Sequence, residues 1–145
     1  MSLRSSRTAA SFFATPPVKV NSSVTPPDRE MIEIARILNN LGKDVELTTR
    51  VIGGATCASG CVAVFMQGQK RKASGASVWV FHGACAAGTN VPSISATQAY
   101  LDLLTNSGVD KDFTCKLVQE GYVIRPGAWI ISGHELFYIH KSNII

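Results

Sequence analysis

The strongest constraint on the fold is a strand pattern that is followed by a glycine pair and then by a dense apolar run. Residues 45–52 alternate between apolar and polar side chains, the period of a half-buried strand, and Gly53 and Gly54 end it. Residues 61–66 are apolar at every position, which predicts a buried helix of about three turns. Ser59 therefore stands where a strand turns sharply into a helix.

Ser59 and His82 are the candidate catalytic pair. A second apolar strand, predicted at 78–81, ends just before His82. Catalytic groups converge at the carboxyl ends of strands in α/β folds, and Ser59 also lies beside the free N–H groups of a first helical turn. Taken singly, the serine is typical of a helix N-cap and the histidine of a hydrogen-bonded residue at the edge of the core. Together they indicate a nucleophile and its base.

The order of predicted elements indicates an α/β domain. A helix over 31–41 precedes the 45–52 strand, the Ser59 helix and the 78–81 strand, a β-α-β-α-β alternation together with an expected short strand at 18–20. This order is typical of a mostly parallel sheet with covering helices. Helices near 100–104 and 113–118, a strand at 129–131 and a capping box of Ser132 with Glu135 follow as a C-terminal helical arm.

Length and charge limit the number of domains and the kinds of binding partner to expect. A chain of 145 residues fits one domain, expected at 17–145, with 1–16 as a disordered or degenerate targeting segment. The net charge of +4 owes much to Arg4, Arg7 and Lys19, so we expect no nucleic-acid binding. The basic cluster at 70–72 is predicted to be a solvated turn. No segment approaches the ~18 apolar residues of a membrane-spanning helix, so no membrane span is expected.

The four cysteines do not form a metal or redox motif. Cys57 and Cys61 are spaced neither as a zinc-binding pair nor as a redox pair, and no metal or cofactor is expected. They are interpreted as small packing residues around the turn. In an exported protein, a bridge between any two of Cys57, Cys61, Cys85 and Cys115 is the alternative.

Several motifs together resemble the active-site core of Clp-type serine peptidases, in the Clp/crotonase superfamily. They are Gly54-Ala55-Thr56-Cys57-Ala58-Ser59-Gly60-Cys61, Gly68-Gln69-Lys70-Arg71, Gly75-Ala76 and Phe81-His82-Gly83. The chain is most similar to the exported, Clp-protease-like bacterial group, whose nucleophilic serine lies in a small-residue motif that cysteines often flank. A loop at 21–25 and the segment 129–136 extend the resemblance over residues 18–145.

The resemblance implies a ClpP/crotonase-like fold and assigns roles to five residues. Ser59 would be the nucleophile and His82 the general base. The backbone N–H of Gly60, with one from Val24 or Thr25, would hold the oxyanion. The resemblance also implies a peptide or protein substrate, no cofactor, and homo-oligomers with residues 96–121 as the contact arm. It implies a periplasmic or otherwise exported location, or a cytoplasmic one if the N-terminus carries no signal.

Three departures from the family pattern bear on activity. Val24 and Thr25 replace a glycine pair in the oxyanion loop, and β-branched residues resist positive φ and close approach. The acid that would orient the histidine belongs near Gly127 and Ala128, where none is present. Few residues precede the oxyanion loop, so the chain looks truncated at its N-terminus.

The sequence thus predicts a ClpP-like serine hydrolase with weak or absent peptide hydrolysis. The alternative is a non-catalytic peptide-binding or assembly module. An acyl-CoA hydratase or isomerase of the same superfamily would leave the Ser59 and His82 pair without a role.

Overall fold

The computed structural model describes residues 2–4, 9–13, 20–21, 28–41, 46–85, 91–124 and 127–145. The helices are α1 (Asp28–Leu41), α2 (Gly60–Phe65), α3 (Ile94–Asn106), α4 (Lys111–Gln119) and the π-helical segment η2 (Glu135–Ile139). The strands are β1 (Ser2–Arg4), β2 (Ala9–Phe13), β3 (Val20–Asn21), β4 (Thr48–Val51), β5 (Thr56–Ala58), β6 (Lys70–Ala73), β7 (Val78–Phe81) and β8 (Trp129–Ser132). None of the helices in these ranges is long and apolar enough to cross a membrane.

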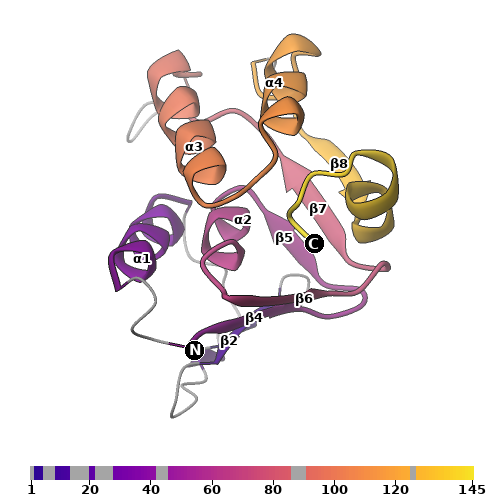
Figure 1. Cartoon of the computed structure of the whole chain (residues 1–145). Coiled ribbons are helices and arrows are strands. Elements are labelled where there is room, and N and C mark those ends of the chain that lie inside the picture. The colour runs from indigo at the N-terminus through magenta and orange to yellow at the C-terminus, as the bar shows by residue number, and fades with distance from the viewer. Residues whose placement is uncertain are drawn as a thin grey trace.

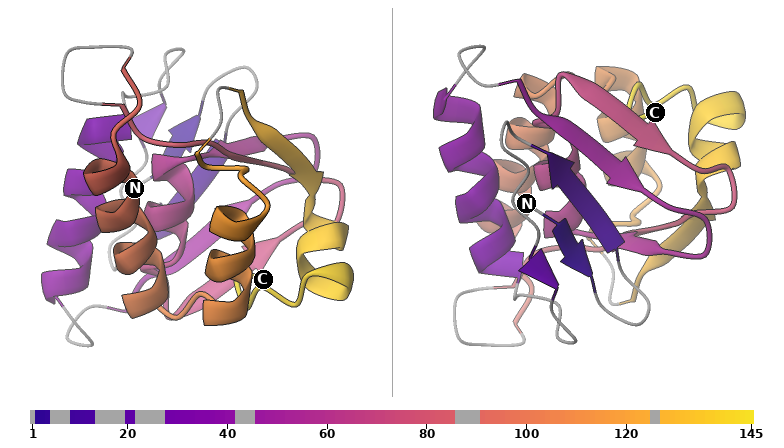
Figure 2. Two further views of the ribbon diagram at one scale, coloured as in Figure 1. Left: turned by 90° about the horizontal axis from the view of Figure 1, so that it is seen from above. Right: turned by 90° about the horizontal axis from the view of Figure 1, so that it is seen from below.

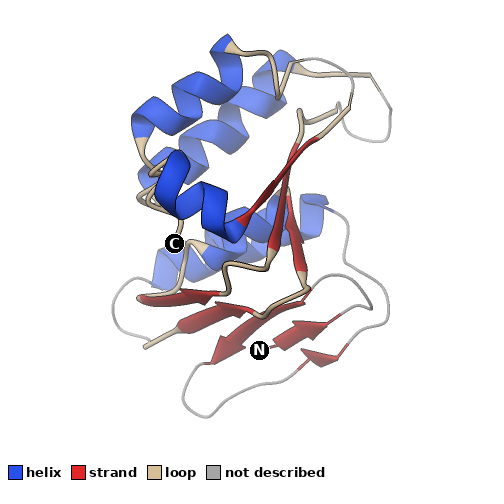
Figure 3. Cartoon of the chain, turned by 90° about the vertical axis from the view of Figure 1, so that its right-hand side faces the viewer, coloured by secondary structure: helices blue, strands red, loops and turns tan. Residues whose placement is uncertain are grey.

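The strands form two sheets, of order β3-β1-β2-β4-β6 and β5-β7-β8. They lie at a steep angle to each other (Figure 3). The mixed α/β class is confirmed, but the expectation of a mostly parallel sheet is wrong, because both sheets combine parallel and antiparallel pairs. The chain passes from β4 in one sheet to β5 in the other through Gly54, whose φ is +78°. The glycine pair therefore joins β4 to β5, a strand of the other sheet.

Helix α2 lies at the centre of the fold (Figure 1). It is shorter than the predicted three turns, at six residues, and all of them are buried. Thr49 of β4 donates a hydrogen bond of 2.6 Å to the carbonyl of Phe65, the last residue of the helix. The chain then turns at Gly68 and enters β6. Seen from above, α1, α3 and α4 form a row that covers α2 and the sheets (Figure 2).

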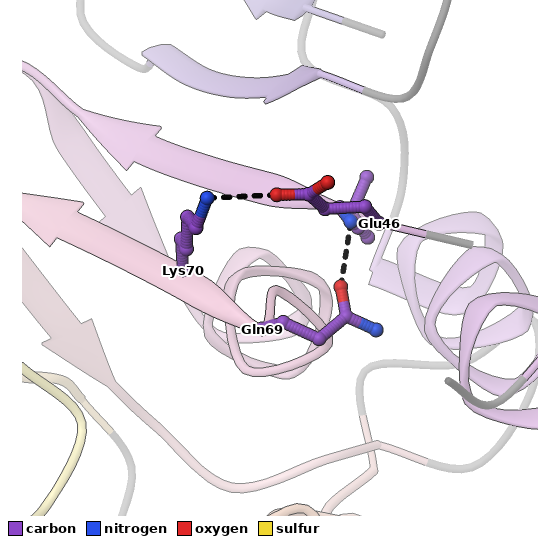
Figure 4. Close-up of polar contacts among 4 residues, drawn as sticks. Glu46, Gln69 and Lys70 are labelled. Carbon is purple, nitrogen blue, oxygen red and sulfur yellow. Dashed lines mark hydrogen bonds and ion pairs between the residues drawn. The ribbon is translucent and has the colours of Figure 1, made fainter. Parts of the chain in front are cut away.

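Strand β6 corrects the prediction of a solvated turn at residues 70–72. It runs parallel to β4, with Thr48 opposite Lys70. The Gln69 side chain accepts a hydrogen bond of 2.6 Å from the Leu47 N–H, and Lys70 pairs with Glu46 at 2.7 Å (Figure 4). Exposed and half-buried side chains alternate along β6, which is an edge strand. Because its sequence is largely polar, the apolar pattern of a strand was not visible.

The N-terminal strands also differ from expectation. Residues 1–16 were expected to be disordered or a degenerate targeting segment, whereas β1 and β2 lie within them. β2 runs antiparallel to β4, with Ala10 opposite Val51 (Figure 2, right). These strands extend the larger sheet, so the first residues of the chain contribute strands that the sequence did not indicate.

The C-terminal capping box is confirmed. The Glu135 carboxylate accepts hydrogen bonds from the N–H and the hydroxyl of Ser132 at 2.7 and 3.0 Å, and the Ser132 hydroxyl accepts one from the Glu135 N–H at 3.1 Å. The hydrogen bond from the Ser132 backbone, and then the one from its side chain, lower the pKa of Glu135. The carboxylate is thereby committed to the start of η2.

Candidate active site

Ser59 occupies a strained turn between β5 and α2. Its φ of 47° and ψ of −109° match the first central position of a type II′ turn, which normally requires glycine. The strand that precedes Ser59 is β5, not the 45–52 strand that the sequence suggested. Strain of this kind persists only where the surroundings fix it, and it concentrates at functional sites. The geometry is that of a nucleophile elbow, in which a serine sits on a sharp strand-to-helix turn.

The structure also rules out the ordinary explanation of Ser59 as an N-cap. An N-cap serine has extended backbone angles and its side chain accepts a hydrogen bond from the first helical turn. The Ser59 side chain makes no capping hydrogen bond to α2, and its backbone is not extended. The residue is only 6% exposed. Its position is therefore not explained by helix capping.

The backbone of Ser59 is fixed on both sides. Its N–H donates to the carbonyl of Val80 on β7 at 2.9 Å. Its carbonyl accepts from the Val62 N–H at 2.9 Å and from the Tyr100 hydroxyl at 2.6 Å. The elbow is therefore joined to the neighbouring strand, to its own helix and to α3.

His82 leaves the sheet beside Ser59. Strands β5 and β7 are parallel neighbours with Ala58 opposite Val80, so Ser59 follows one strand at the level of Phe81 and His82 comes next on the other. Neighbouring strands lie about 4.8 Å apart. The structure thus places the backbones of these two residues, which are distant in sequence, at adjacent strand ends.

A backbone carbonyl sets the tautomer of His82. The imidazole Nδ1 lies 2.9 Å from the carbonyl oxygen of Gly83. A carbonyl only accepts hydrogen bonds, so Nδ1 carries the proton and, in the neutral ring, Nε2 carries the lone pair. This is the tautomer that a serine hydrolase needs, since Nε2 is the nitrogen that takes the proton of the nucleophile.

The segment after His82 is held tightly. A side chain on Gly83 would overlap the carbonyl oxygen of Val123, so only glycine fits there. The Ala84 N–H donates to the Thr97 hydroxyl of α3 at 2.9 Å. Thr97 and Val123 also line an apolar pocket of about 110 Å³ together with Ile94, Leu101, Val118 and their neighbours. A pocket that suits a small apolar group therefore borders the segment that carries His82.

The position expected for the orienting acid is in register with His82. In the β7–β8 ladder Phe81 pairs with Trp129, so the next pair along would be His82 and Ala128. Ala128 is exposed and carries no carboxylate. The two acids nearest to Ala128 in sequence have other partners: Glu120 accepts from the Tyr122 hydroxyl at 2.7 Å, and Glu135 is held in its capping box. Asp110, further away, caps α4 by accepting from the Phe113 N–H at 3.1 Å.

A disulfide spans the elbow. Cys57 of β5 and Cys61 of α2 are bonded, with 5.3 Å between their Cα atoms, and both are fully buried. The structure thus selects one of the bridges left open as an alternative to plain packing, while Cys85 and Cys115 are free and exposed. The spacing of four residues gave no sign of this bond. The strand-to-helix turn at Ser59 is what brings the two Cα atoms together.

Of the remaining predicted site residues, the structure describes one and leaves two outside its described ranges. Gly60 begins α2 and is buried, while Val24 and Thr25 lie outside the described residues. Tyr100 and the Gly83 carbonyl were not predicted, because no local sequence motif marks either of them. Within the part of the chain that the structure describes, no group of histidines, cysteines and acids is arranged to hold a metal ion.

No protein-family model, characterised protein or solved structure matches the chain. A function is therefore inferred from the geometry and the sequence motifs alone.

Replacing Ser59 by glycine and by alanine should distinguish the effect of backbone strain from the effect of losing the hydroxyl. Both Ser59→Gly and Ser59→Ala remove the hydroxyl, but only glycine adopts positive φ without strain. We expect the glycine variant to be more stable than the alanine variant by about 1 kcal/mol, a strain of 1–3 kcal/mol less the entropy cost of glycine. Urea unfolding measures the difference. At the exposed helical position Ala99, Ala99→Gly should destabilise instead, by about 1 kcal/mol. Equal stability of the two Ser59 variants would mean that the elbow is unstrained.

Loss of the disulfide should loosen the elbow. We expect the double variant Cys57→Ala/Cys61→Ala to lose about 2 kcal/mol of unfolding free energy, as predicted for a short cross-linked loop. Reduction of the wild type with a dithiol should lower the denaturation midpoint in the same direction. The matched control is Cys85→Ala/Cys115→Ala, which changes exposed free thiols. If reduction leaves the midpoint unchanged, the bond does not stabilise the elbow.

Proposed function

We propose that the chain is a serine hydrolase of the Clp type, with Ser59 as nucleophile and His82 as general base. The observation that carries the proposal is the strained elbow at Ser59, hydrogen-bonded to strand β7, which ends just before His82. The sequence motifs around both residues support the same family and, with it, a ClpP/crotonase-like fold. The substrate class is then a carboxylic ester or amide, and a peptide or protein by resemblance.

The chemistry follows from the roles of the two side chains. His82 Nε2 takes the Ser59 hydroxyl proton as the oxygen attacks the substrate carbonyl carbon. The tetrahedral intermediate places its negative oxygen near the Gly60 N–H. Collapse expels the alcohol or amine, which receives the proton from His82 and leaves an acyl group on Ser59. Water, activated by the same histidine, then releases the acid.

The Gly83 carbonyl replaces only part of what an acid would do. It fixes the tautomer of His82, because it accepts the Nδ1 proton. A neutral carbonyl stabilises the imidazolium less than a carboxylate does, since charge-assisted hydrogen bonds are roughly twice as strong. We therefore propose good reactivity with activated esters and phosphonates, and weak hydrolysis of peptides.

The other implications of the resemblance stay part of this proposal. Self-association through residues 96–121 is supported by the exposure of Val118, which lines one pocket with the exposed Ile94 just before that range. An exported location is supported by the Cys57–Cys61 disulfide, because such bonds persist in oxidising compartments.

The second candidate is a non-catalytic peptide-binding or assembly module. The absence of a carboxylate at Ala128, the position in register with His82, favours it. A family member that had lost turnover would bind peptides without cleaving them.

An active-site probe distinguishes the two candidates. We expect a fluorophosphonate to label the wild type at Ser59, and labelling to be abolished in Ser59→Ala and to fall ~10²-fold or more in His82→Ala, the usual contribution of a general base. Peptide mapping by mass spectrometry identifies the labelled residue. Ser74, on the turn after β6, provides the control variant Ser74→Ala, which should label like the wild type. Wild-type protein that stays unlabelled would leave the binding module as the better account.

Supplying the acid should raise peptide hydrolysis. Ala128→Asp places a carboxylate in register with His82, whereas Gly127, with a φ of +109°, tolerates a side chain poorly. We expect turnover of a short peptide to rise, by much less than the ~10⁴ that loss of a triad acid costs. Ala128→Asn, which carries no charge, is the matched control.

Two results would contradict this account of the defect. Rapid peptide hydrolysis by the wild type would show that another group already stabilises the His82 imidazolium. An equal gain in Ala128→Asp and Ala128→Asn would show that charge at this position is irrelevant.

A further inference from the structure

We infer that Tyr100 is a positioning residue that holds the Ser59–Gly60 peptide so that the Gly60 N–H faces the oxyanion. The inference rests on the proposed hydrolase function, but the peptide geometry at its centre can be tested without substrate.

Tyr100 reaches the elbow from a distant part of the chain. It lies on the buried face of α3, is 3% exposed, and its hydroxyl donates to the Ser59 carbonyl at 2.6 Å. A buried hydroxyl group requires a partner, and here the partner is the one backbone carbonyl that lies between the nucleophile and the proposed oxyanion donor. The phenol thus adds a second hydrogen bond to a carbonyl that also accepts from the Val62 N–H of α2.

The orientation of this peptide decides where the Gly60 N–H points. In a trans peptide the C=O and N–H bonds point in opposite directions. The Ser59 carbonyl is turned toward Tyr100 and Val62, so the Gly60 N–H is turned to the opposite side of the same plane. Any rotation that takes the carbonyl away from Tyr100 also moves the N–H.

A competing conformation makes the anchor necessary. A residue with φ near +50° normally has ψ near +47°, in the left-handed region. Ser59 has φ of 47° and ψ of −109°, so relaxation into that well would rotate its ψ by about 156° and turn the peptide over. The Gly60 N–H would then leave the oxyanion position. The hydrogen bond from Tyr100 stabilises the catalytic orientation against this flip.

The hydrogen bond from Tyr100 also affects the strength of the Gly60 N–H as a hydrogen-bond donor. A hydrogen bond to a peptide carbonyl polarises the whole amide and makes its N–H a stronger donor. Tyr100 is therefore expected to affect the transition state, where the oxyanion forms, more than the binding of the uncharged substrate.

The test is Tyr100→Phe, with Tyr122→Phe as the matched control, because Tyr122 donates its hydroxyl to the exposed Glu120. With an activated ester we expect kcat to fall by ~10- to 100-fold, less than the 10²–10³ for complete loss of an oxyanion donor, with KM little changed. Affinity for a trifluoromethyl ketone, which forms a tetrahedral oxyanion on serine, should fall in the same proportion as kcat/KM. The pH profile should keep its shape, because His82 is untouched.

Three results would overturn the inference: unchanged kcat, a rise in KM alone, or ketone affinity that stays constant while kcat falls. A crystal structure of Tyr100→Phe gives a readout that needs no activity. We expect the Ser59–Gly60 peptide to be turned over or present in two orientations, and a single unchanged orientation would also overturn the inference. If the wild type itself hydrolyses nothing, the proposed function fails, and the crystal structure still decides whether Tyr100 orients the peptide.

Discussion

The parallel pairing of β5 with β7 is the constraint on which the site depends. The ladder ends with Ala58 opposite Val80, and the hydrogen bond from the Ser59 N–H to the Val80 carbonyl carries it one residue further. Because both strands stop here, the chain on each side must turn, one into α2 and the other toward α3. The two turning residues are Ser59 and His82. The adjacent backbone positions of these two residues are thus set by the sheet and do not depend on a flexible loop.

Several independent contacts hold the strained turn in place. The Cys57–Cys61 bond closes it covalently, Tyr100 anchors its carbonyl, and α2 is buried along its whole length. On the other side, Gly83 packs closely against the Val123 backbone, so the backbone beside His82 has little freedom to shift. The backbone at both positions is therefore held in place, and the Gly83 carbonyl sets the imidazole tautomer. Ala128, the residue in register with His82, carries no charge that could stabilise the imidazolium.

The sequence predicted the parts of the site that depend on local pattern. The Ser59 turn could be predicted because it lies between a glycine pair and an apolar run, and the position of His82 because it follows an apolar strand. The capping box of Ser132 and Glu135 could be predicted because its spacing is specific. The strands β5 and β6 were missed, since one is three residues long and the other is largely polar. The Gly83 carbonyl, the Tyr100 hydroxyl and the register of Ala128 depend on tertiary contacts, which no local pattern encodes.

The central claim is that His82 presents an unprotonated Nε2 beside Ser59, with the proton held on Nδ1 by the Gly83 carbonyl. Nitrogen NMR of the imidazole, assigned by the loss of its signals in His82→Gln, measures this directly at a pH where the ring is neutral. The account predicts a protonated Nδ1 and an unprotonated Nε2, in one dominant tautomer. A ring protonated on Nε2 would contradict it, because that nitrogen could not take the proton of Ser59.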